Sequence, residues 1–380
     1  MSEILNRLLG LKGSQMEIFF ERVRELQSIM QAEGVEQLAV SPSANLRYLN
    51  GLDIMPDDRL TLAVFPAQGQ PFLLVSRLYE GEAKALEPLF RPIFIADDAS
   101  VSAALKQALS QDSGPTAIDE RMWASHFMRL LEHLGRQSSY IPAGRLLSQL
   151  RVRKSRGEIS LLKEAGRIAA AAFRAVLPQL RAGLTERQLV NMLELEMKKA
   201  GGEGLSFPSI AAFGANAANP HHSAGQAELA AGQFVMMDFG CTFQGYCSDI
   251  TRTVCFGRAD ALQKELYQVV LQANLAARAR VAPGVPAHSV ERAAREIIEA
   301  AGYGPHFIHR IGHGVGLDVH EAPHFGEKSG HILREGMVFS IEPGLYLPGK
   351  IGLRIEDVVA LDENGIEDMH VLDKELLEIV

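Results

Sequence analysis

Histidine is concentrated in one part of the chain: six of its twelve histidines lie between His306 and His331. Imidazole ligates metal ions and exchanges protons near neutral pH, so a cluster of this kind indicates chemistry more strongly than a surface scatter does. The densest segment, 312–321, holds His313 and His320. A metal site or a proton-transfer site is therefore expected to include this segment.

Two familiar patterns in this segment do not fit their usual structures. His320-Glu-Ala-Pro-His324 matches the His-Glu-x-x-His pattern of zinc proteases, which works only on a helix, where both histidines share a face. Pro323 inside the pattern and the glycines before it disfavour a helix. The glycine-spaced segment Gly312–Gly316 lacks the Lys-Ser/Thr and the strand–helix context of a phosphate loop. Both interpretations are therefore rejected.

Asp238 and Asp249 flank a sequence that is typical of a hairpin. Gly240 and Gly245 lie between them and are expected to form the turn. Paired strands would bring the two carboxylates side by side. This arrangement predicts the first half of a metal site.

Two later carboxylates, Glu342 and Glu356, lie in segments that alternate like strands. Taken singly, each of the four carboxylates is typical of a turn or a helix cap. Four of them converging on a sheet would repel one another and lose hydration, unless cations neutralise them. With His313 as a nitrogen ligand, they predict a site for two divalent ions per subunit.

The donor set also indicates the kind of ion. Oxygen ligands with one imidazole favour manganese, iron, cobalt or zinc over copper(I), and the histidine disfavours magnesium. Manganese is the first expectation, with cobalt, zinc or iron as alternatives.

The elements that must position these residues are repeated in the second half of the chain. Gly183 matches Gly284 at an offset of 101 residues, and both precede a helical pattern. Thr185 and Gln188 form a capping-box pattern at the start of the first of these helices. Further matches have an offset of 104 residues: Gly232, Asp238 and Gly240 correspond to Gly336, Glu342 and Gly344. Two similar helix-and-sheet units about a pseudo-two-fold axis would each deliver a carboxylate to a shared cleft.

The first 150 residues alternate between helix-like and strand-like patterns. Apolar residues recur at helical spacing over 16–34, where Gly34 ends the helix. Strands are expected at 38–40, 61–65, 72–76 and 93–96, and helices at 102–109 and 124–134. The segment 151–158 is dense in charge. We therefore expect an α/β domain at 1–152 and a catalytic domain at 157–380.

The composition excludes several classes of protein. A net charge of −8 disfavours nucleic-acid and anionic membrane partners. No apolar run approaches the roughly 18 residues of a membrane span, and residues 1–13 lack the pattern of a secretory signal. The three cysteines fall within fifteen residues and cannot all pair in one chain. A cytoplasmic protein with reduced thiols is expected.

The motifs together resemble those of the pita-bread metallopeptidases, the family of prolidase and aminopeptidase P. The matching motifs are Asp238-x-Gly240, Ser248-Asp-Ile-Thr-Arg-Thr253, Gly312-His-Gly-x-Gly316 with His320-Glu, Glu342-Pro-Gly344 and Arg354-x-Glu-Asp357. In the first domain, Asn45–Gly51 is similar to part of the creatinase-like N-terminal domain of that family. The resemblance implies an α/β N-terminal domain followed by an α+β pita-bread catalytic domain with an internal pseudo-two-fold repeat. Methionine aminopeptidases usually lack such an N-terminal domain.

The resemblance also implies residue roles. The implied metal ligands are Asp238, Asp249, His313, Glu342 and Glu356, of which Asp249 and Glu356 bridge the two ions. The implied active-site histidines are His221, His309 and His320. Arg354 resembles an arginine near the bridging glutamate, and His222 is interpreted only as a neighbour of His221.

The reaction implied by the resemblance is hydrolysis of the peptide bond before proline, by a hydroxide that bridges the two ions. His309 and His320 would hydrogen-bond the tetrahedral intermediate, and Glu342 would move a proton to the leaving nitrogen. Prolidases commonly carry an arginine at the position of His324, where it pairs with the free carboxylate of a dipeptide. The histidine favours, as an alternative, an aminopeptidase P that acts on longer Xaa-Pro peptides.

Proteins of different activity could share part of this pattern. A metal-dependent hydrolase or lyase of another small substrate would retain most of the ligands. Creatinase-like enzymes use no metal, and non-catalytic pita-bread proteins bind other partners; both lack several of these carboxylates. The family resemblance also implies a homodimer, with the loop Leu52–Arg59 as the candidate contact.

Overall fold

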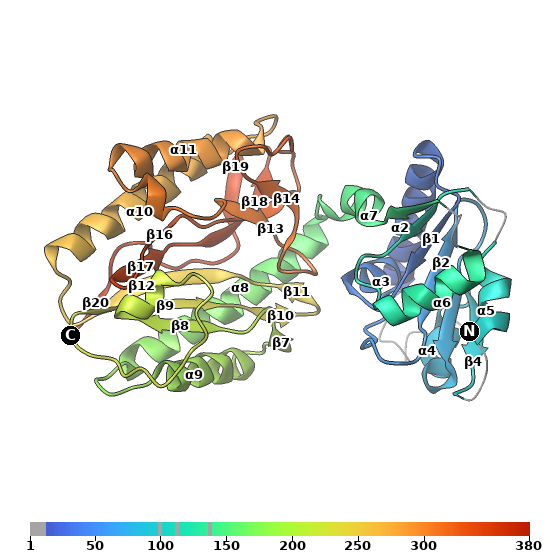
Figure 1. The fold of residues 1–380 in the computed structure, drawn as a ribbon, viewed down its shortest axis with the longest axis horizontal. Coiled ribbons are helices and arrows are strands. Elements are labelled where there is room, and N and C mark those ends of the chain that lie inside the picture. The colour runs from blue at the N-terminus through green and yellow to red at the C-terminus, as the bar shows by residue number, and fades with distance from the viewer. Residues whose placement is uncertain (1–12, 98–100, 111–113, 136–138) are drawn as a thin grey trace. The chain divides into compact units, whose positions relative to one another are not determined.

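The computed structural model describes residues 13–97, 101–110, 114–135 and 139–380. The expectation about a secretory signal falls almost wholly on residues 1–12, which lie outside the described residues. The chain divides into two compact units, the first ending at Leu150 and the second formed by Arg151–Val380 (Figure 1). Within the described ranges, no helix combines the length and the apolar character that crossing a membrane requires.

A six-stranded mixed sheet forms the centre of the first unit. Its strands, in order across the sheet, are β4 (Arg91–Ile95), β3 (Phe72–Ser76), β2 (Leu62–Pro66), β1 (Gln37–Val40), β5 (Thr116–Ile118) and β6 (Tyr140–Pro142). Strand β2 is antiparallel to both neighbours, and the other three pairings are parallel. Apolar residues of the sheet pack against α5 (Val101–Ala108) and α6 (Ala124–Leu134).

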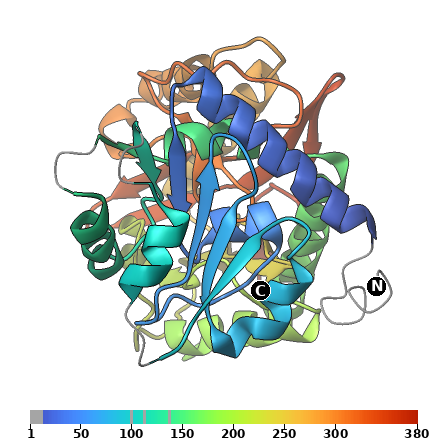
Figure 2. The same cartoon turned by 90° about the vertical axis from the view of Figure 1, so that its right-hand side faces the viewer.

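The long helix α2 (Gly13–Ala32) is the dark-blue helix of Figure 2. Its apolar residues Phe19, Val23, Leu26 and Met30 are all buried, as the helical spacing predicts. The described part of this unit also contains the α-helices α3 (Ala44–Asn50), α4 (Glu80–Ala85) and α7 (Gly144–Arg151), the last of which ends at the first residue of the second unit. The α/β class predicted for this part of the chain is confirmed.

The second unit contains two similar halves, each with a pair of helices packed on a sheet. In the first half, α8 (Arg156–Val176) and α9 (Glu186–Lys199) pack on β8 (Ile210–Phe213), β9 (Gln233–Phe239) and β12 (Ile250–Phe256). The short strands β7 (Gly204–Leu205), β10 (Cys241–Phe243) and β11 (Tyr246–Cys247) form a small additional sheet. A 3₁₀ turn, η3 (Gly214–Ala218), follows β8.

In the second half, α10 (Ala261–Arg280) and α11 (Ala287–Ala300) take the place of α8 and α9. The sheet has the strand order β14 (Glu321–Phe325), β13 (Gly312–Gly314), β15 (Val338–Ile341), β18 (Asp357–Asp362) and β19 (Gly365–Asp368). Strands β16 (Gly344–Leu347) and β17 (Ile351–Arg354) form a separate hairpin, and β20 (Glu378–Ile379) pairs with β12 of the first half. Figure 1 shows the strands between the two helix pairs, which confirms the predicted repeat.

Several local predictions can be compared with the observed elements. Thr185 and Gln188 form the predicted capping box at the start of α9. Gly245 lies in the β10–β11 turn with φ of +83°, as predicted. The prediction that Gly240 also forms the turn is wrong: it lies before β10, where a Cβ atom would collide with the carbonyl oxygen of Ser248. Residues Glu321–Phe325 form a strand, so the zinc-protease pattern does not lie on a helix.

Candidate metal centre

The five predicted ligands come from the ends of strands in both halves of the second unit. Asp238 lies in β9, Asp249 directly precedes β12, and His313 is the middle residue of β13. Glu342 follows β15, and Glu356 lies between β17 and β18. Because these strands belong to the two facing sheets, their ends converge and bring the side chains together.

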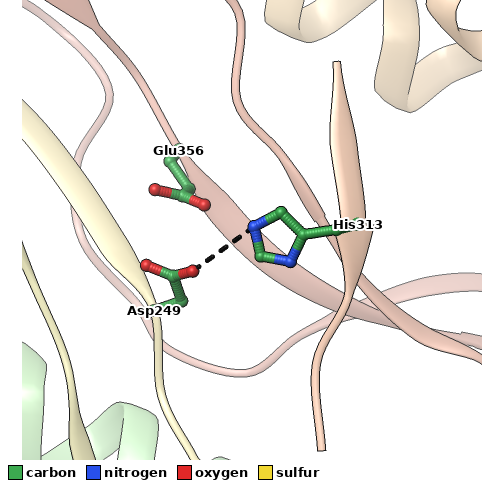
Figure 3. Close-up of side chains that lie close together, drawn as sticks. All are labelled: Asp249, His313 and Glu356. Carbon is green, nitrogen blue, oxygen red and sulfur yellow. Dashed lines mark ion pairs between the residues drawn. The ribbon is translucent and has the colours of Figure 1, made fainter. Parts of the chain in front are cut away.

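Three of the five residues form a tight donor cluster, shown in Figure 3. One ligand atom each of Asp249, His313 and Glu356 lies within 4.8 Å of the others. The Nε2 atom of His313 is 3.6 Å from Oδ2 of Asp249 and 3.2 Å from Oε1 of Glu342. All three members of the cluster are buried. Donors this close are the arrangement that a divalent ion needs.

Burial and mutual repulsion act on the carboxylates of the five ligand candidates. Burial, together with the charges of neighbouring carboxylates, raises the pKa of Asp249 and of Glu356 well above the usual range. Burial also raises the pKa of Asp238, although Arg354 opposes the shift. For Glu342 burial acts in the same direction, but His313 outweighs it and the pKa is lowered.

Unpartnered oxygen atoms provide the test of whether metal ions fit here. Oδ1 of Asp238, Oδ1 of Asp249 and Oε1 of Glu356 are buried and form no hydrogen bond with any described residue. Buried carboxylate oxygens are normally hydrogen-bonded or bound to a cation. The donor set and its orphaned oxygens therefore fit divalent ions.

Arg354 connects Asp238 with two hydroxyl groups near the cluster. It is buried, pairs with Asp238, and donates to the Tyr346 hydroxyl at 2.6 Å and to Oγ1 of Thr251 at 3.0 Å. Thr251 in turn donates to Oε2 of Glu356 at 2.7 Å. The sequence predicted Arg354 but not Thr251 or Tyr346, although Thr251 lies within the motif that follows Asp249.

The three predicted active-site histidines line one cavity of about 660 Å³ with all five ligands and Arg354. Nδ1 of His309 is 2.8 Å from the carbonyl oxygen of Arg310, and Nε2 is 3.0 Å from the Tyr346 hydroxyl. The ring of His320 stands edge-on to that of His313, with centroids 4.2 Å apart. Burial, and then the charge of His313, lower the pKa of His320 to about 4, and burial lowers that of His309. Both rings are therefore neutral near pH 7.

His222 is more than a neighbour of His221, in contrast to the sequence interpretation. Its Nε2 atom is 2.8 Å from Oε2 of Glu186, the first residue of α9, which is wholly buried. Glu186 also accepts from the side chain of Asn216 and from the backbone N–H groups of Phe213 and Gly225. One carboxylate thus holds both ends of the segment that carries His221.

His324 lies in β14 directly opposite His313 of β13. Directly opposed residues of an antiparallel pair point to the same face of the sheet. His324 lines an adjoining cavity of about 690 Å³, which shares His309, Ile308 and Arg310 with the metal cavity. The position associated with dipeptide binding in prolidases is therefore next to the metal cavity.

The fold and this buried cluster define a metallopeptidase with a two-fold repeated catalytic unit. The chain belongs to metallopeptidase family M24, whose model matches residues 160–363, and the creatinase/prolidase N-terminal domain matches residues 22–153. It is 33% identical over 359 residues to a putative dipeptidase of Bacillus subtilis, covering 94% of this chain and 99% of that protein.

Two further comparisons carry more specific names. The chain is 32% identical over 357 residues to a Xaa-Pro dipeptidase of Lactobacillus delbrueckii subsp. lactis, covering 93% of this chain and 97% of that protein. The structure of a prolidase from Thermococcus sibiricus has a TM-score of 0.90 and 34% identity, covering 95% of this chain and 99% of that one. The predicted family resemblance is confirmed.

Proposed function

We propose that this metallopeptidase hydrolyses the peptide bond before proline in small peptides, with Xaa-Pro dipeptides as its preferred substrates. The observation that carries the proposal is the single cavity that gathers five metal-ligand candidates and three imidazoles. The relatives whose names include a Xaa-Pro dipeptidase and a prolidase support the choice of substrate.

The residues that would hold two divalent ions, manganese first, are the five ligand candidates of this cavity, three of which have a buried oxygen without a partner among the described residues. Asp249, His313 and Glu356, whose donor atoms form the tight cluster, would hold the ions together with the neighbouring Asp238 and Glu342. When bound, such ions would lower the pKa of a water molecule so that hydroxide is available as a nucleophile near neutral pH, and they would polarise the scissile carbonyl.

The remaining chemistry falls to the side chains of the cavity. Neither ring nitrogen of His320 forms a hydrogen bond with another residue in the described part of the chain. A neutral His320 can therefore donate a hydrogen bond to the developing oxyanion. Glu342, whose pKa is lowered, is ionised near pH 7 and can accept a proton from water and deliver it to the leaving nitrogen.

His309 and His221 have supporting roles in this proposal. When Nδ1 of His309 donates to the Arg310 carbonyl, Nε2 accepts from the Tyr346 hydroxyl, because the pKa of Tyr346 is raised to about 12 and the phenol keeps its proton. His309 then forms a fixed wall of the cavity. His221 lines the same cavity and is assigned to substrate binding.

An aminopeptidase for longer Xaa-Pro peptides is the second candidate, because His324 lacks the bidentate fork of an arginine. The test uses protein purified without chelator, in which bound metal is counted, removed, and replaced by manganese, cobalt or zinc. A Xaa-Pro dipeptide and a Xaa-Pro-Xaa tripeptide are then assayed side by side. A homodimer is also proposed, and light scattering during size-exclusion chromatography tests it.

The variant Glu342→Gln tests the catalytic assignment. It should reduce kcat at least about 100-fold, the scale of a lost general base. Glu363→Gln, which changes an exposed carboxylate, is the matched control and should not alter kcat. Metal-restored cleavage of the dipeptide supports the proposal. A protein that holds metal but cleaves neither peptide refutes it and favours another small substrate.

A further inference from the structure

Arg310 occupies the junction of two cavities. It follows His309 and precedes β13, and it lines both the metal cavity and the adjoining cavity that holds His324. Its side chain is exposed. No role was predicted for this residue from the sequence.

The guanidinium of Arg310 has no acidic partner among the described residues. Arg295, which lines the same adjoining cavity, is by contrast paired with Glu291 at 2.6 Å and with Glu327 at 3.4 Å. Arg310 shares the metal cavity with His320 and the adjoining cavity with His324. An exposed guanidinium that pairs with no acidic group in the described part of the chain has its charge available for an anionic ligand.

The position of Arg310 matches where a dipeptide would place its negative charge. In a Xaa-Pro dipeptide the free carboxylate is attached to the proline Cα, so it lies within about one residue length, about 3.5 Å, of the scissile nitrogen. With the scissile bond beside His320 and Glu342, we place that carboxylate at the edge that the metal cavity shares with the adjoining cavity. Arg310 stands at this edge, and His324 shares the adjoining wall.

We propose that Arg310, assisted by His324, binds the free α-carboxylate of a dipeptide substrate. The inference rests on the proposed function, and it explains how the chain can prefer dipeptides although position 324 holds histidine. Arginine binds a carboxylate through two parallel N–H···O bonds, and an imidazole can add one N–H donor. A peptide with an amidated or extended C-terminus would lose the ion pair.

The experiment compares a Xaa-Pro dipeptide with the same dipeptide carrying a C-terminal amide. Arg310→Gln should lower kcat/KM for the free dipeptide about 10- to 100-fold, mainly through KM, as expected for a lost charge-assisted hydrogen bond. The amide should be cleaved equally by both proteins. Arg310→Lys should restore part of the preference, because lysine keeps the charge without the fork.

Lys328 provides a matched control, since it is an exposed cation of the same adjoining cavity. Lys328→Gln should leave the preference for the free dipeptide unchanged. Metal content and thermal midpoint, measured for each variant, establish that the proteins are folded and loaded. A loss of preference in Lys328→Gln, with none in Arg310→Gln, would overturn the assignment.

Two further outcomes separate this inference from the proposed function. Equal losses on the dipeptide and the amide in Arg310→Gln would overturn the inference while Xaa-Pro hydrolysis stands. If the metal-loaded wild-type protein cleaves neither peptide, the proposed function fails, and calorimetric titration with the free dipeptide and its amide still tests the inference. Tighter binding of the free dipeptide that disappears in Arg310→Gln supports it, and equal binding refutes it.

Discussion

Replacement of Glu186 should destabilise the second unit strongly without removing a ligand candidate. This residue is wholly buried, and its pKa is lowered because hydrogen bonds from His222, Asn216 and two backbone N–H groups outweigh the effect of burial. Two donors reach each oxygen: Phe213 and Asn216 at Oε1, at 3.0 and 2.8 Å, and His222 and Gly225 at Oε2, at 2.8 and 3.0 Å.

The variant Glu186→Gln keeps one carbonyl oxygen and replaces the other oxygen by an NH₂ group. That group cannot accept from the Gly225 N–H, and it can pair with His222 only through the other ring tautomer. Two hydrogen bonds to a charged group, each contributing about 1.5–3 kcal/mol, are weakened or lost inside the protein. We expect a loss of about 3–5 kcal/mol in the free energy of unfolding.

Urea unfolding followed by circular dichroism measures this loss. Glu228→Gln, an exposed acid three residues after Gly225, is the control and should change stability by less than about 0.5 kcal/mol. A double-mutant cycle with His222→Gln should give a coupling energy of about 1–3 kcal/mol. If Glu186→Gln matches the control, or if the two changes are additive, the reasoning about this buried carboxylate is refuted.

Three further predictions concern pH, metal and thiols. Burial lowers the pKa of His370 to about 4, so this histidine stays neutral in the folded protein and becomes protonated at higher pH in the unfolded chain. The free energy of unfolding should therefore fall by about 3 kcal/mol as the pH is lowered from about 6.5 to 4. His370→Gln should make the thermal midpoint less dependent on pH over that range. An unchanged pH dependence in this variant would contradict the account. Removing metal with a chelator should lower the thermal midpoint, and manganese at about 100 times its Kd should restore about 2.7 kcal/mol per site; a midpoint that does not respond to either would argue against the site. Burial raises the pKa of Cys241 to about 11, so dithionitrobenzoate at about pH 8 should label this thiol only after unfolding, and rapid labelling of the folded protein would show that it is accessible.

The sequence was sufficient for features that depend on local periodicity. The spacing of Phe19, Val23, Leu26 and Met30 predicted α2, and Thr185 with Gln188 predicted the start of α9. Both signals depend on residues only three or four positions apart in the sequence. Pro323 excluded a helix for the same reason. The repeat of glycines and carboxylates predicted the two facing halves.

Contacts between distant residues were beyond this kind of prediction. Glu186 and His222 are 36 positions apart, and Thr251 and Glu356 are 105 apart. A period-two or period-3.6 pattern states which face a residue occupies, not which residue it meets there. Gly240 illustrates the limit: its type was noticed, but the contact with Ser248 that requires a missing Cβ appears only after β10 and β11 fold back.

The division of the ligands between the two halves has a consequence for how such a chain can be built. The first half supplies Asp238 and Asp249, the second supplies His313, Glu342 and Glu356, and β20 returns from the C-terminus to complete the first sheet. Neither half holds the full donor set, so separate fragments cut between β12 and α10 would have to associate before they could bind both ions. Joining them in one polypeptide replaces that encounter by a high effective concentration. Metal binding by the intact chain would therefore not depend on protein concentration, whereas in a split version of the chain bound metal would hold the two fragments together.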